Sequence, residues 1–547
     1  MNYNLLPLLP PLIVLGLGFI TRRVLLSLLS GIICASLIAT NGSILTSIRL
    51  IFDRFFANTE LWRLSSWNAF TQSGNLFICL FIFILGILVT LLSYSGGAYA
   101  YARTVKKYIK NKKSAELSSL GLSSLFFIDD YFSSLTVGSV MSSITDSFRI
   151  PRVKLAFLVD AFAAPLAILC PASSWVAAII GFLGENGIHT KITSETLIIA
   201  DPLNVYIHIL PFLFYSFTIM LSAYFIVIRT ISFGPMQRHE RIAQNTGNVF
   251  GNTSTAQNKL VFSPTPQNNH SHATIVDFIY PVLILLISVF TGLLFSGGYY
   301  LIGGNRSFIS ALQHAQAAKA LFFGGFIALL LITVFFLLRK KIPYTMLLSL
   351  YWNGILLMIP AILTLLFSWT LGDILRDSLH TGTLLASIAH TLSVKSWALP
   401  ALFFIFSVLT SIAIGSSWGT IALLIPIALP MLLSLESIII LPVPIEQVRF
   451  LFPLLGAIFS GAVAGDHISP ISDTTIMAST STGSSHIEHV YTQLWYACPA
   501  IIGSISSFLL AGILIEYNWN AVALLSVIPG IVLTLCVLQL LQKYAHN

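Results

Sequence analysis

The chain has 547 residues, of which 56% are hydrophobic and 9% are charged. A soluble protein carries about 25% charged residues, so this chain has too few charges to cover a water-exposed surface of its size. The composition therefore excludes soluble enzymes, nucleic-acid-binding proteins and secreted disulfide scaffolds. It predicts an integral membrane protein with many helices. The five cysteines show no paired spacing, so we expect no metal or redox centre among them.

Eleven apolar runs have the length of a spanning helix, which needs about 20 residues. Two further apolar stretches, 118–145 and 398–434, are rich in Ser, Gly and Thr around their middle. The eleven runs lie near residues 5–20, 24–40, 75–94, 155–182, 203–228, 276–296, 318–338, 344–371, 450–478, 491–515 and 520–541.

Charge placement decides how the two ambiguous stretches are interpreted. Lysine and arginine concentrate on the cytoplasmic side of membrane proteins. If each stretch enters the membrane and returns as a re-entrant hairpin, 19 of the 28 basic residues fall inside and 9 outside. This arrangement predicts an N-terminus outside and a C-terminus in the cytoplasm.

The same arrangement divides the chain into two halves of opposite orientation, residues 75–228 and 344–515. Each half reads as a helix, a hairpin, a helix with a central Asp, and a helix. Inverted-topology repeats of this kind, with broken elements near the bilayer midplane, are typical of secondary transporters. We therefore expect an all-α polytopic membrane protein with about 11 transmembrane helices and two re-entrant hairpins. The other expected parts are N-terminal helices (1–74), a polar cytoplasmic linker (229–275), connecting helices (276–343) and a C-terminal helix (516–547).

Five acidic residues lie at membrane depth, where a carboxylate costs at least about 2.5 kcal/mol and therefore indicates a function. They are Asp129 and Asp130 in the first hairpin, Asp160, Asp466 and Asp473. An unpaired acid in apolar surroundings holds either a proton or a cation. A site that holds one or the other, but not both, performs the chemistry of a cation/proton antiporter.

The segment from Gly465 to Thr475 carries the most specific pattern. Pro470 interrupts the helix and frees backbone carbonyls, and carboxyl, hydroxyl and carbonyl oxygens suit a hard cation such as Na⁺. We expect Asp466 and Asp473 to bind Na⁺ directly. The role of His467 stays open between a proton relay and the orientation of Asp466. The oxygen-bearing residues of the segment are Asp466, Ser469, Ser472, Asp473 and Thr474.

The second hairpin turns within Gly415-Ser416-Ser417-Trp418-Gly419-Thr420. Small residues permit a tight turn, and hydroxyls can cap the returning helix or face a ligand. Because a helix N-terminus favours anions, this turn could hold a substrate carboxylate. The candidate residues are Gly415, Ser416, Ser417, Gly419 and Thr420. Ser173-Ser174-Trp175 repeats the triplet at a different place in its half, so we attach no weight to the likeness.

Taken together, the motifs resemble the NhaC-type sodium/proton antiporter family of the ion-transporter superfamily. The resemblance covers roughly residues 70–230 and 340–515, in the same order. It implies a multi-pass antiporter of the bacterial inner (plasma) membrane that exchanges Na⁺ for H⁺ and whose partners are lipids, small cations and protons. It implies no cofactor, and it leaves a homodimer open. The ion- and proton-handling positions that it implies are Asp129, Asp130, Asp160, Asp466, Ser469, Ser472, Asp473 and Thr474.

Three alternatives stay open at this stage. The first is a Na⁺- or H⁺-coupled carrier of a small organic acid or amino acid, whose carboxylate the hydroxyl-lined turn would bind. The second is a channel, which two symmetric broken elements argue against. The third is a membrane-embedded enzyme, which we do not expect because the sequence contains no nucleophile–His arrangement and no H-E-x-x-H motif.

Overall fold

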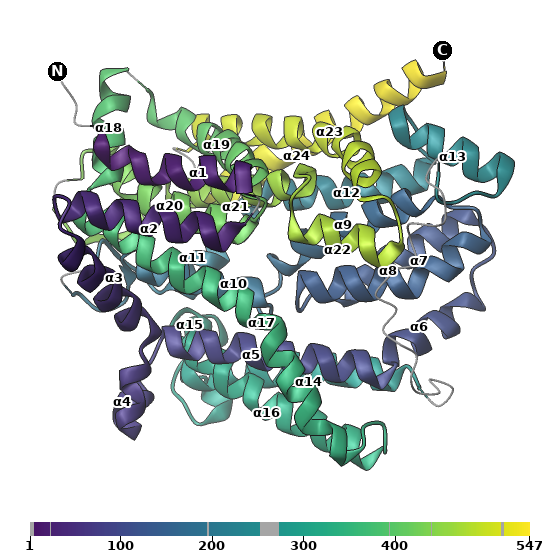
Figure 1. The fold of residues 1–547 in the computed structure, drawn as a ribbon, viewed down its shortest axis with the longest axis horizontal. Helices are drawn as coiled ribbons and strands as arrows, with labels where there is room; N and C mark the ends of the chain where they lie inside the picture. The colour runs from purple at the N-terminus through teal and green to yellow at the C-terminus, as the bar shows by residue number, and fades with distance from the viewer. Residues whose placement is uncertain are drawn as a thin grey trace.

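The computed structural model describes residues 5–21, 23–193, 196–251, 273–392, 394–438, 440–515 and 519–546, and these residues are mostly helical (Figure 1). Within them, ten helices are long and apolar enough to cross a membrane. The chain is therefore an all-α polytopic membrane protein, as its composition predicts. Residues 252–272, which include much of the predicted linker, lie outside the described residues.

Four long helices in the lower part of Figure 1 match apolar runs of the sequence almost to the residue. Close approach of helices in lipid relies on small residues. Gly86 and Gly354 provide such a contact, because a Cβ atom on either would overlap the backbone of the other helix. The four helices are α5 (Asn75–Ser95), α14 (Val276–Ser296), α16 (Ala317–Leu338) and α17 (Tyr344–Asp373).

The N-terminal helices occupy the predicted runs 5–20 and 24–40 almost completely, but they are short for spanning helices. After a 3-10 turn (Leu6–Leu8), α1 spans Leu9–Thr21 and α2 spans Val24–Ala39, which are 13 and 16 residues. Both are shorter than the about 20 residues that cross a bilayer upright. The hydropathy of the sequence does not reveal α3 (Ile44–Thr59), because charged residues interrupt its apolar pattern.

The first predicted half consists of short helices after α5, and two of its apolar runs are broken. Pro171 follows α9, lies in the gap 168–173 and ends the helix there because its ring cannot continue the hydrogen-bond ladder. The predicted span 155–182 is thus wrong as a continuous helix, and the run 203–228 also divides. The helices are α6 (Gly97–Lys106), α7 (Lys112–Leu125), α8 (Asp130–Ser147), α9 (Arg152–Ala167), α10 (Ser174–Glu185), α11 (Pro202–Ile209) and α12 (Phe214–Arg229).

The second predicted half, after α17, also contains a broken apolar run. The run 450–478 is likewise not one helix, because the Ser469–Ser472 segment, with Pro470, separates α21 from α22. The stretch 398–434 forms two helices joined at Gly415 and Ser416, each long enough by composition to cross a membrane. The helices are α18 (Thr381–Thr391), α19 (Leu399–Ile414), α20 (Ser417–Leu435), α21 (Leu451–Ile468), α22 (Asp473–Thr482) and α23 (His486–Ile513).

The remaining elements connect these two groups. Part of the predicted linker forms a helix, α13 (Gly234–Thr246), and the chain ends in α24 (Trp519–His546). Two small helices, α4 (Trp67–Phe70) and α15 (Phe308–Gln313), lie in loops. Loops from both halves meet in a small parallel sheet of order β1-β2-β3, in which Ile198 pairs with both Ile188 and Val443. Its strands are β1 (Ile188–His189), β2 (Ile198–Ile199) and β3 (Val443–Pro444).

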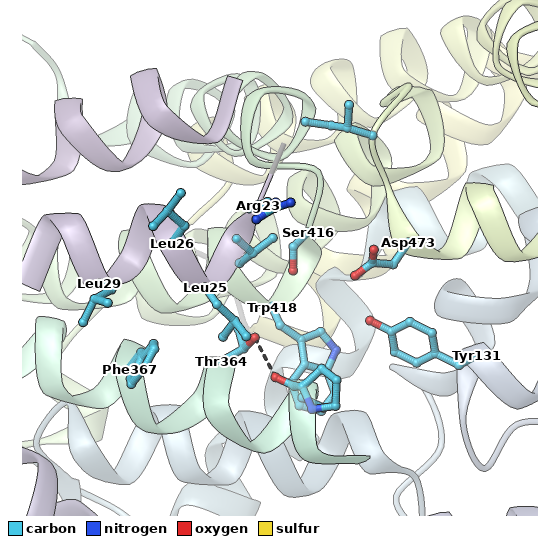
Figure 2. Close-up of a pocket in the computed structure, with 14 residues that line it drawn as sticks. Arg23, Leu25, Leu26, Leu29, Tyr131, Thr364, Phe367, Ser416, Trp418 and Asp473 are labelled. Carbon is cyan, nitrogen blue, oxygen red and sulfur yellow. Dashed lines mark hydrogen bonds between the residues drawn. The ribbon is translucent and has the colours of Figure 1, made fainter. Parts of the chain in front are cut away.

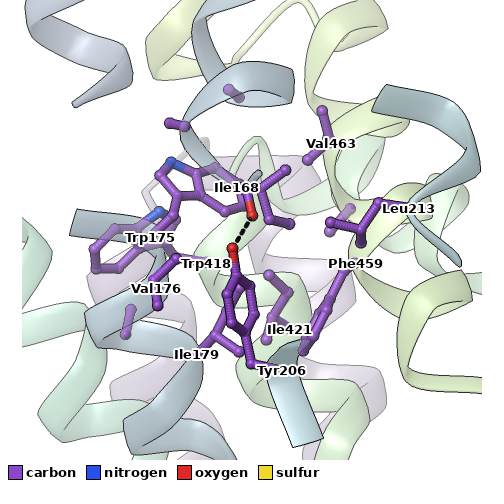
Figure 3. Packing of buried hydrophobic residues seen from close by; sticks show 14 of the residues in the cluster. Ile168, Trp175, Val176, Ile179, Tyr206, Leu213, Trp418, Ile421, Phe459 and Val463 are labelled. Carbon is purple, nitrogen blue, oxygen red and sulfur yellow. Dashed lines mark hydrogen bonds between the residues drawn. The ribbon is translucent and has the colours of Figure 1, made fainter. Parts of the chain in front are cut away.

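The buried core lies where the broken helices of the two halves meet (Figure 3). Trp175 of α10 contacts Trp418 of α20 with ring centroids 6.1 Å apart. The Tyr206 hydroxyl donates a 2.8 Å hydrogen bond to the Ile168 carbonyl, just after α9 ends. A polar group in the unwound backbone is thereby satisfied inside the protein, as it must be at membrane depth.

Candidate functional site

Four helices begin around one small central cavity. α8 begins at Asp130, whereas α10, α20 and α22 are capped by the hydroxyls of Ser173, Ser416 and Ser472, each accepting a backbone N–H hydrogen bond at 3.3 Å. The cavity has a volume of about 10 Å³, close to the smallest space that holds a water molecule. It is lined by Asp130, Tyr131, Trp175, Gly415, Ser416, Ser417, Trp418, Asp466, Asp473 and Thr474.

Asp466 stands in the last turn of α21 and is almost fully buried. Its Oδ2 atom accepts a 2.7 Å hydrogen bond from Thr474 Oγ1, and Thr474 Oγ1 lies 3.0 Å from Ser472 Oγ. Asp473 occupies the first turn of α22, where the positive end of the helix dipole stabilises a negative charge. The break between α21 and α22 therefore brings two carboxylates and two hydroxyls to the same place.

The acidic pair of the first half divides between two environments. Asp130 lines the cavity from the first turn of α8. Asp129 is directed to α10, where its Oδ2 atom accepts a 2.9 Å hydrogen bond from Ser174 Oγ. The backbone N–H of Ser174 donates to the Ile128 carbonyl at 3.0 Å, so the start of α10 holds the start of α8 in position.

Gly415 brings the turn between α19 and α20 against the α21–α22 break. Its φ of +71° lies in the left-handed region, and a Cβ atom there would lie 2.5 Å from Ile471 Cγ1. Ser417 Oγ donates to the Ala462 carbonyl at 3.1 Å, and Thr420 Oγ1 donates to the Ser416 carbonyl at 2.9 Å. These hydroxyls thus fix the turn, while Gly419 provides the N–H that Ser416 caps.

Seven of the predicted site residues do not line the central cavity, and four of them hold the helix starts described above: Asp129, Ser472, Gly419 and Thr420. Ser469 Oγ donates to the Ile412 carbonyl at 3.0 Å and so ties the break to α19. Asp160 and His467 lie on another side of the break, where Asp160 accepts hydrogen bonds from Gln493 and Thr475, and His467 Nδ1 lies 3.0 Å from the Tyr215 hydroxyl.

A larger cavity of about 510 Å³ adjoins the small one and shares Tyr131, Ser416, Trp418 and Asp473 with it. Figure 2 shows Arg23 next to Ser416, with the carboxylate of Asp473 and the hydroxyl of Tyr131 directed toward the same space. The rest of the wall is mainly apolar and comes largely from α2 and α17. It includes Val24, Leu25, Leu26, Leu29, Pro360, Ala361 and Phe367.

Sequence reasoning missed the two tryptophans and Tyr131 as site residues. The repeated Ser-Ser-Trp triplet was a usable signal, because each copy begins a helix and the two tryptophans meet beside the cavity. Their different places in the two halves concealed this meeting. No local sequence pattern marked Arg23, His489 or Gln493 as site residues, because their neighbours in the structure come from distant parts of the chain.

Comparisons with known proteins match this geometry to transporters. The model of the Na⁺/H⁺ antiporter family matches residues 166–513. A Haemophilus influenzae protein without an assigned function is 29% identical over 510 residues, covering 92% of this chain and 90% of that protein.

Two further relatives match a shorter part. The malate-2H⁺/Na⁺-lactate antiporter of Bacillus subtilis is 29% identical over 162 residues (29% of this chain, 30% of that protein). An uncharacterized Na⁺/H⁺ antiporter of H. influenzae is 29% identical over 167 residues, which are 30% of this chain and 32% of that protein.

Two solved structures share the fold. The YdaH transporter of Alcanivorax borkumensis has a TM-score of 0.51 at 14% identity, covering 87% of this chain and 90% of that one. MtrF of Neisseria gonorrhoeae has a TM-score of 0.53 at 12% identity, and the match covers 87% of this chain and 85% of MtrF.

Proposed function

Since the chain belongs to the Na⁺/H⁺ antiporter family, we propose that it exchanges Na⁺ for protons at Asp466 and Asp473 by alternating access. The sequence resemblance to this family is confirmed, and the chain is a multi-pass membrane transporter and not an enzyme. The exchange of Na⁺ for H⁺ is the part that we propose.

The observation that carries the proposal is the central cavity, which admits one water-sized particle between carboxylates and hydroxyls. Asp130, Asp466 and Asp473 line it together with Ser416 and Thr474. Hard cations prefer such oxygen ligands. Carboxylates that share a buried site cannot all stay ionised without a cation, so either a proton or a Na⁺ ion must be present. Competition between the two makes the exchange obligatory.

The order of the helices supports alternating access. In each half a long helix, α5 or α17, precedes two joined helices, then a broken helix (α9–α10 or α21–α22). This order fits two inverted repeats, at residues 75–228 and 344–515, in which the α7–α8 and α19–α20 pairs are re-entrant hairpins. The proposal keeps the N-terminus outside and the bacterial inner membrane as the location.

The test uses everted membrane vesicles that hold a preset pH gradient. Added Na⁺ should dissipate the gradient in vesicles with the wild-type protein. Asp466→Asn should abolish this response because it removes the competing negative charge. Asp53→Asn is a matched control, because Asp53 on α3 is exposed and pairs with Arg49, its neighbour one turn away. Loss of the response in both variants, or in neither, would contradict the proposal.

One observation favours a second candidate, a Na⁺- or H⁺-coupled carrier of a small organic acid. The 510 Å³ cavity is within the usual size of a small-molecule site, and Arg23 and the capped start of α20 would attract a carboxylate. The similar B. subtilis protein is named for malate and lactate. Uptake of labelled lactate and malate into vesicles, with and without a Na⁺ gradient, distinguishes the candidates: uptake that requires Arg23 favours the carrier.

A further inference from the structure

The segment Ser469–Ser472 lies outside the helices α21 and α22, so contacts with other elements must fix its path. Asp466 precedes the segment and Asp473 follows it, and both carboxylates line the central cavity. The backbone of the segment therefore sets the separation of the two carboxylates. A binding site works only when such supporting contacts hold its groups in place.

Three of the four residues in the segment are held by contacts already described. Ser469 is tied to α19, and Ser472 caps α22. Ile471 lies against Gly415 of the turn between α19 and α20. The fourth residue, Pro470, has no N–H, so its carbonyl is the one backbone group through which a hydrogen bond can hold it.

His486, the first residue of α23, holds this carbonyl. Its Nε2 atom lies 2.7 Å from the Pro470 carbonyl oxygen. Because a carbonyl oxygen can only accept, Nε2 carries the proton and donates it. Pro470 does not line the central cavity, so its carbonyl serves as an anchor for the segment and not as a ligand there.

The other ring nitrogen of His486 is directed to α22. Nδ1 lies 3.2 Å from Ser479 Oγ, which is also 2.8 Å from the Ile476 carbonyl. When Nε2 of a neutral imidazole is protonated, Nδ1 accepts a hydrogen bond, and the Ser479 hydroxyl can donate it. The hydroxyl thereby fixes the tautomer and the orientation of the ring. Ser479, His486 and Pro470 thus connect α22, α23 and the break.

This contact differs from those of two other histidines. His208 and His314 each have Nδ1 2.8 Å from the carbonyl oxygen of the residue four positions earlier. Such a bond stabilises only the local turn. His486 instead reaches a carbonyl 16 residues earlier, in a different element and between the two carboxylates of the cation site.

We propose that His486 is a positioning residue of the cation site: by holding the Pro470 carbonyl, it fixes the break and so the separation of Asp466 and Asp473. This inference rests on the proposed Na⁺/H⁺ exchange and deepens it. Na⁺ binding requires both carboxylates at ligand distance, whereas the movement of the loaded protein does not depend on this hydrogen bond. Loss of the bond therefore weakens Na⁺ binding and leaves turnover almost unchanged.

The experiment measures Na⁺-driven proton movement by the full chain in proteoliposomes. His486→Ala should raise the KM for Na⁺ by about 3- to 10-fold, the worth of one hydrogen bond, and leave kcat near the wild-type value. His486→Gln places an amide N–H near the position of Nε2 and should restore the KM. His486→Asn is one methylene shorter, cannot reach the carbonyl and should resemble His486→Ala.

His314→Ala is the matched control, because His314 is exposed and bonds to the nearby Ser310 carbonyl. It should keep the wild-type KM. A His486→Ala protein with the wild-type KM would overturn the inference, and so would a raised KM that His486→Gln does not restore. If His486→Ala does not fold, the comparison of His486→Gln with His486→Asn decides, and equal KM values for these two would overturn the inference.

Calorimetric Na⁺ titration of the purified proteins in detergent measures binding without turnover. The Kd for Na⁺ should rise in His486→Ala by the same factor as the KM. An unchanged Kd beside normal exchange by the wild type would overturn this inference but leave the proposed function standing. A wild type that neither binds nor exchanges Na⁺ or Li⁺ would overturn the proposed function, and this inference with it.

Discussion

Thr474 Oγ1 in the first turn of α22 donates a 2.7 Å hydrogen bond to the Asp466 carboxylate of α21, across the break between the two helices. The contact joins the two ends of the broken helix at the residue that we assign to cation and proton exchange. Seven residues of the chain lie between Asp466 and Thr474, and Pro470 is one of them. The break thus both exposes the oxygen atoms and keeps them in place.

Replacing Thr474 tests this contact. A hydrogen bond to a charged group contributes about 1.5–3 kcal/mol, so Thr474→Val should raise the KM for Na⁺ by roughly 10- to 100-fold. Thr474→Ser keeps the hydroxyl and should stay near wild type. Na⁺-driven proton movement in vesicles measures both, and equal KM values for the two variants would show that the hydroxyl has no role.

Gly415→Ala should disrupt the site from a distance. The added Cβ atom combines a positive φ with an overlap against Ile471, so we expect about 1–3 kcal/mol of lost stability and strongly reduced exchange. Gly42→Ala separates the two effects, because Gly42 has a φ of +83° but no atom within 4 Å of the new Cβ. Thermal unfolding in detergent should rank Gly415→Ala as the more damaging variant. An equal loss of stability in Gly415→Ala and Gly42→Ala would show that the positive φ alone causes the effect.

Lys154 should be essential for the docking of α13. Its ammonium group lies between Glu116 and Glu240, and Lys154 is 2% exposed. Lys154→Met removes the cation from buried Glu116 and leaves Glu240 with Lys112 at 3.3 Å, and breaking a buried ion pair in this way costs about 3–5 kcal/mol. The double variant Lys154→Met/Glu240→Gln should recover part of this loss, whereas Lys107→Met on the exposed side should cost little. Melting temperatures of the purified proteins provide the comparison, and a single variant as stable as the wild type would refute the role.

Asp201 should make stability depend on pH. Burial raises the pKa of Asp201 to about 6, against the opposing hydrogen bonds from the backbone of Asn204 and Leu203. The ordinary value is about 3.9, so between about pH 4 and 6 the folded state binds more protons than the unfolded state. Stability from this group therefore falls as the pH rises through that range.

Asp201→Asn keeps a capping oxygen for α11 but has no charge to bury. It should be more stable than the wild type at pH 7.5, by about 1–3 kcal/mol, and close to it at pH 4.5. Thermal unfolding at both pH values tests this, with Asp53→Asn as a control that should show no such difference. An Asp201→Asn protein that is less stable than the wild type at pH 7.5 would contradict the argument.

The uniformly apolar helices of the fold could be predicted from the sequence, and the broken central helices could not be predicted in full. α5, α14 and α16 begin and end where uniform apolar runs do. The break at residues 168–173 escaped detection because Ile168, Leu169 and Ala172 are themselves apolar. Hydropathy averaged over a window cannot separate an unwound apolar segment from a helical one.

The acids of the site could also be predicted, because a carboxylate at membrane depth stands out in any apolar run. The hydrogen-bond and charge partners of these acids could not be predicted. His489 and Gln493 belong to a different helix from Asp160 and lie more than 300 residues away in the chain. Only the packing of α23 against α9 and α21 brings these side chains together.

The most direct test of the central claim is the Na⁺ response of a preset pH gradient in everted membrane vesicles, compared between the wild type and Asp466→Asn. Exchange at the α21–α22 break predicts that Na⁺ dissipates the gradient in wild-type vesicles and leaves it intact in Asp466→Asn vesicles with equal amounts of protein. Wild-type vesicles that respond to neither Na⁺ nor Li⁺, or Asp466→Asn vesicles that respond at the wild-type rate, would contradict it.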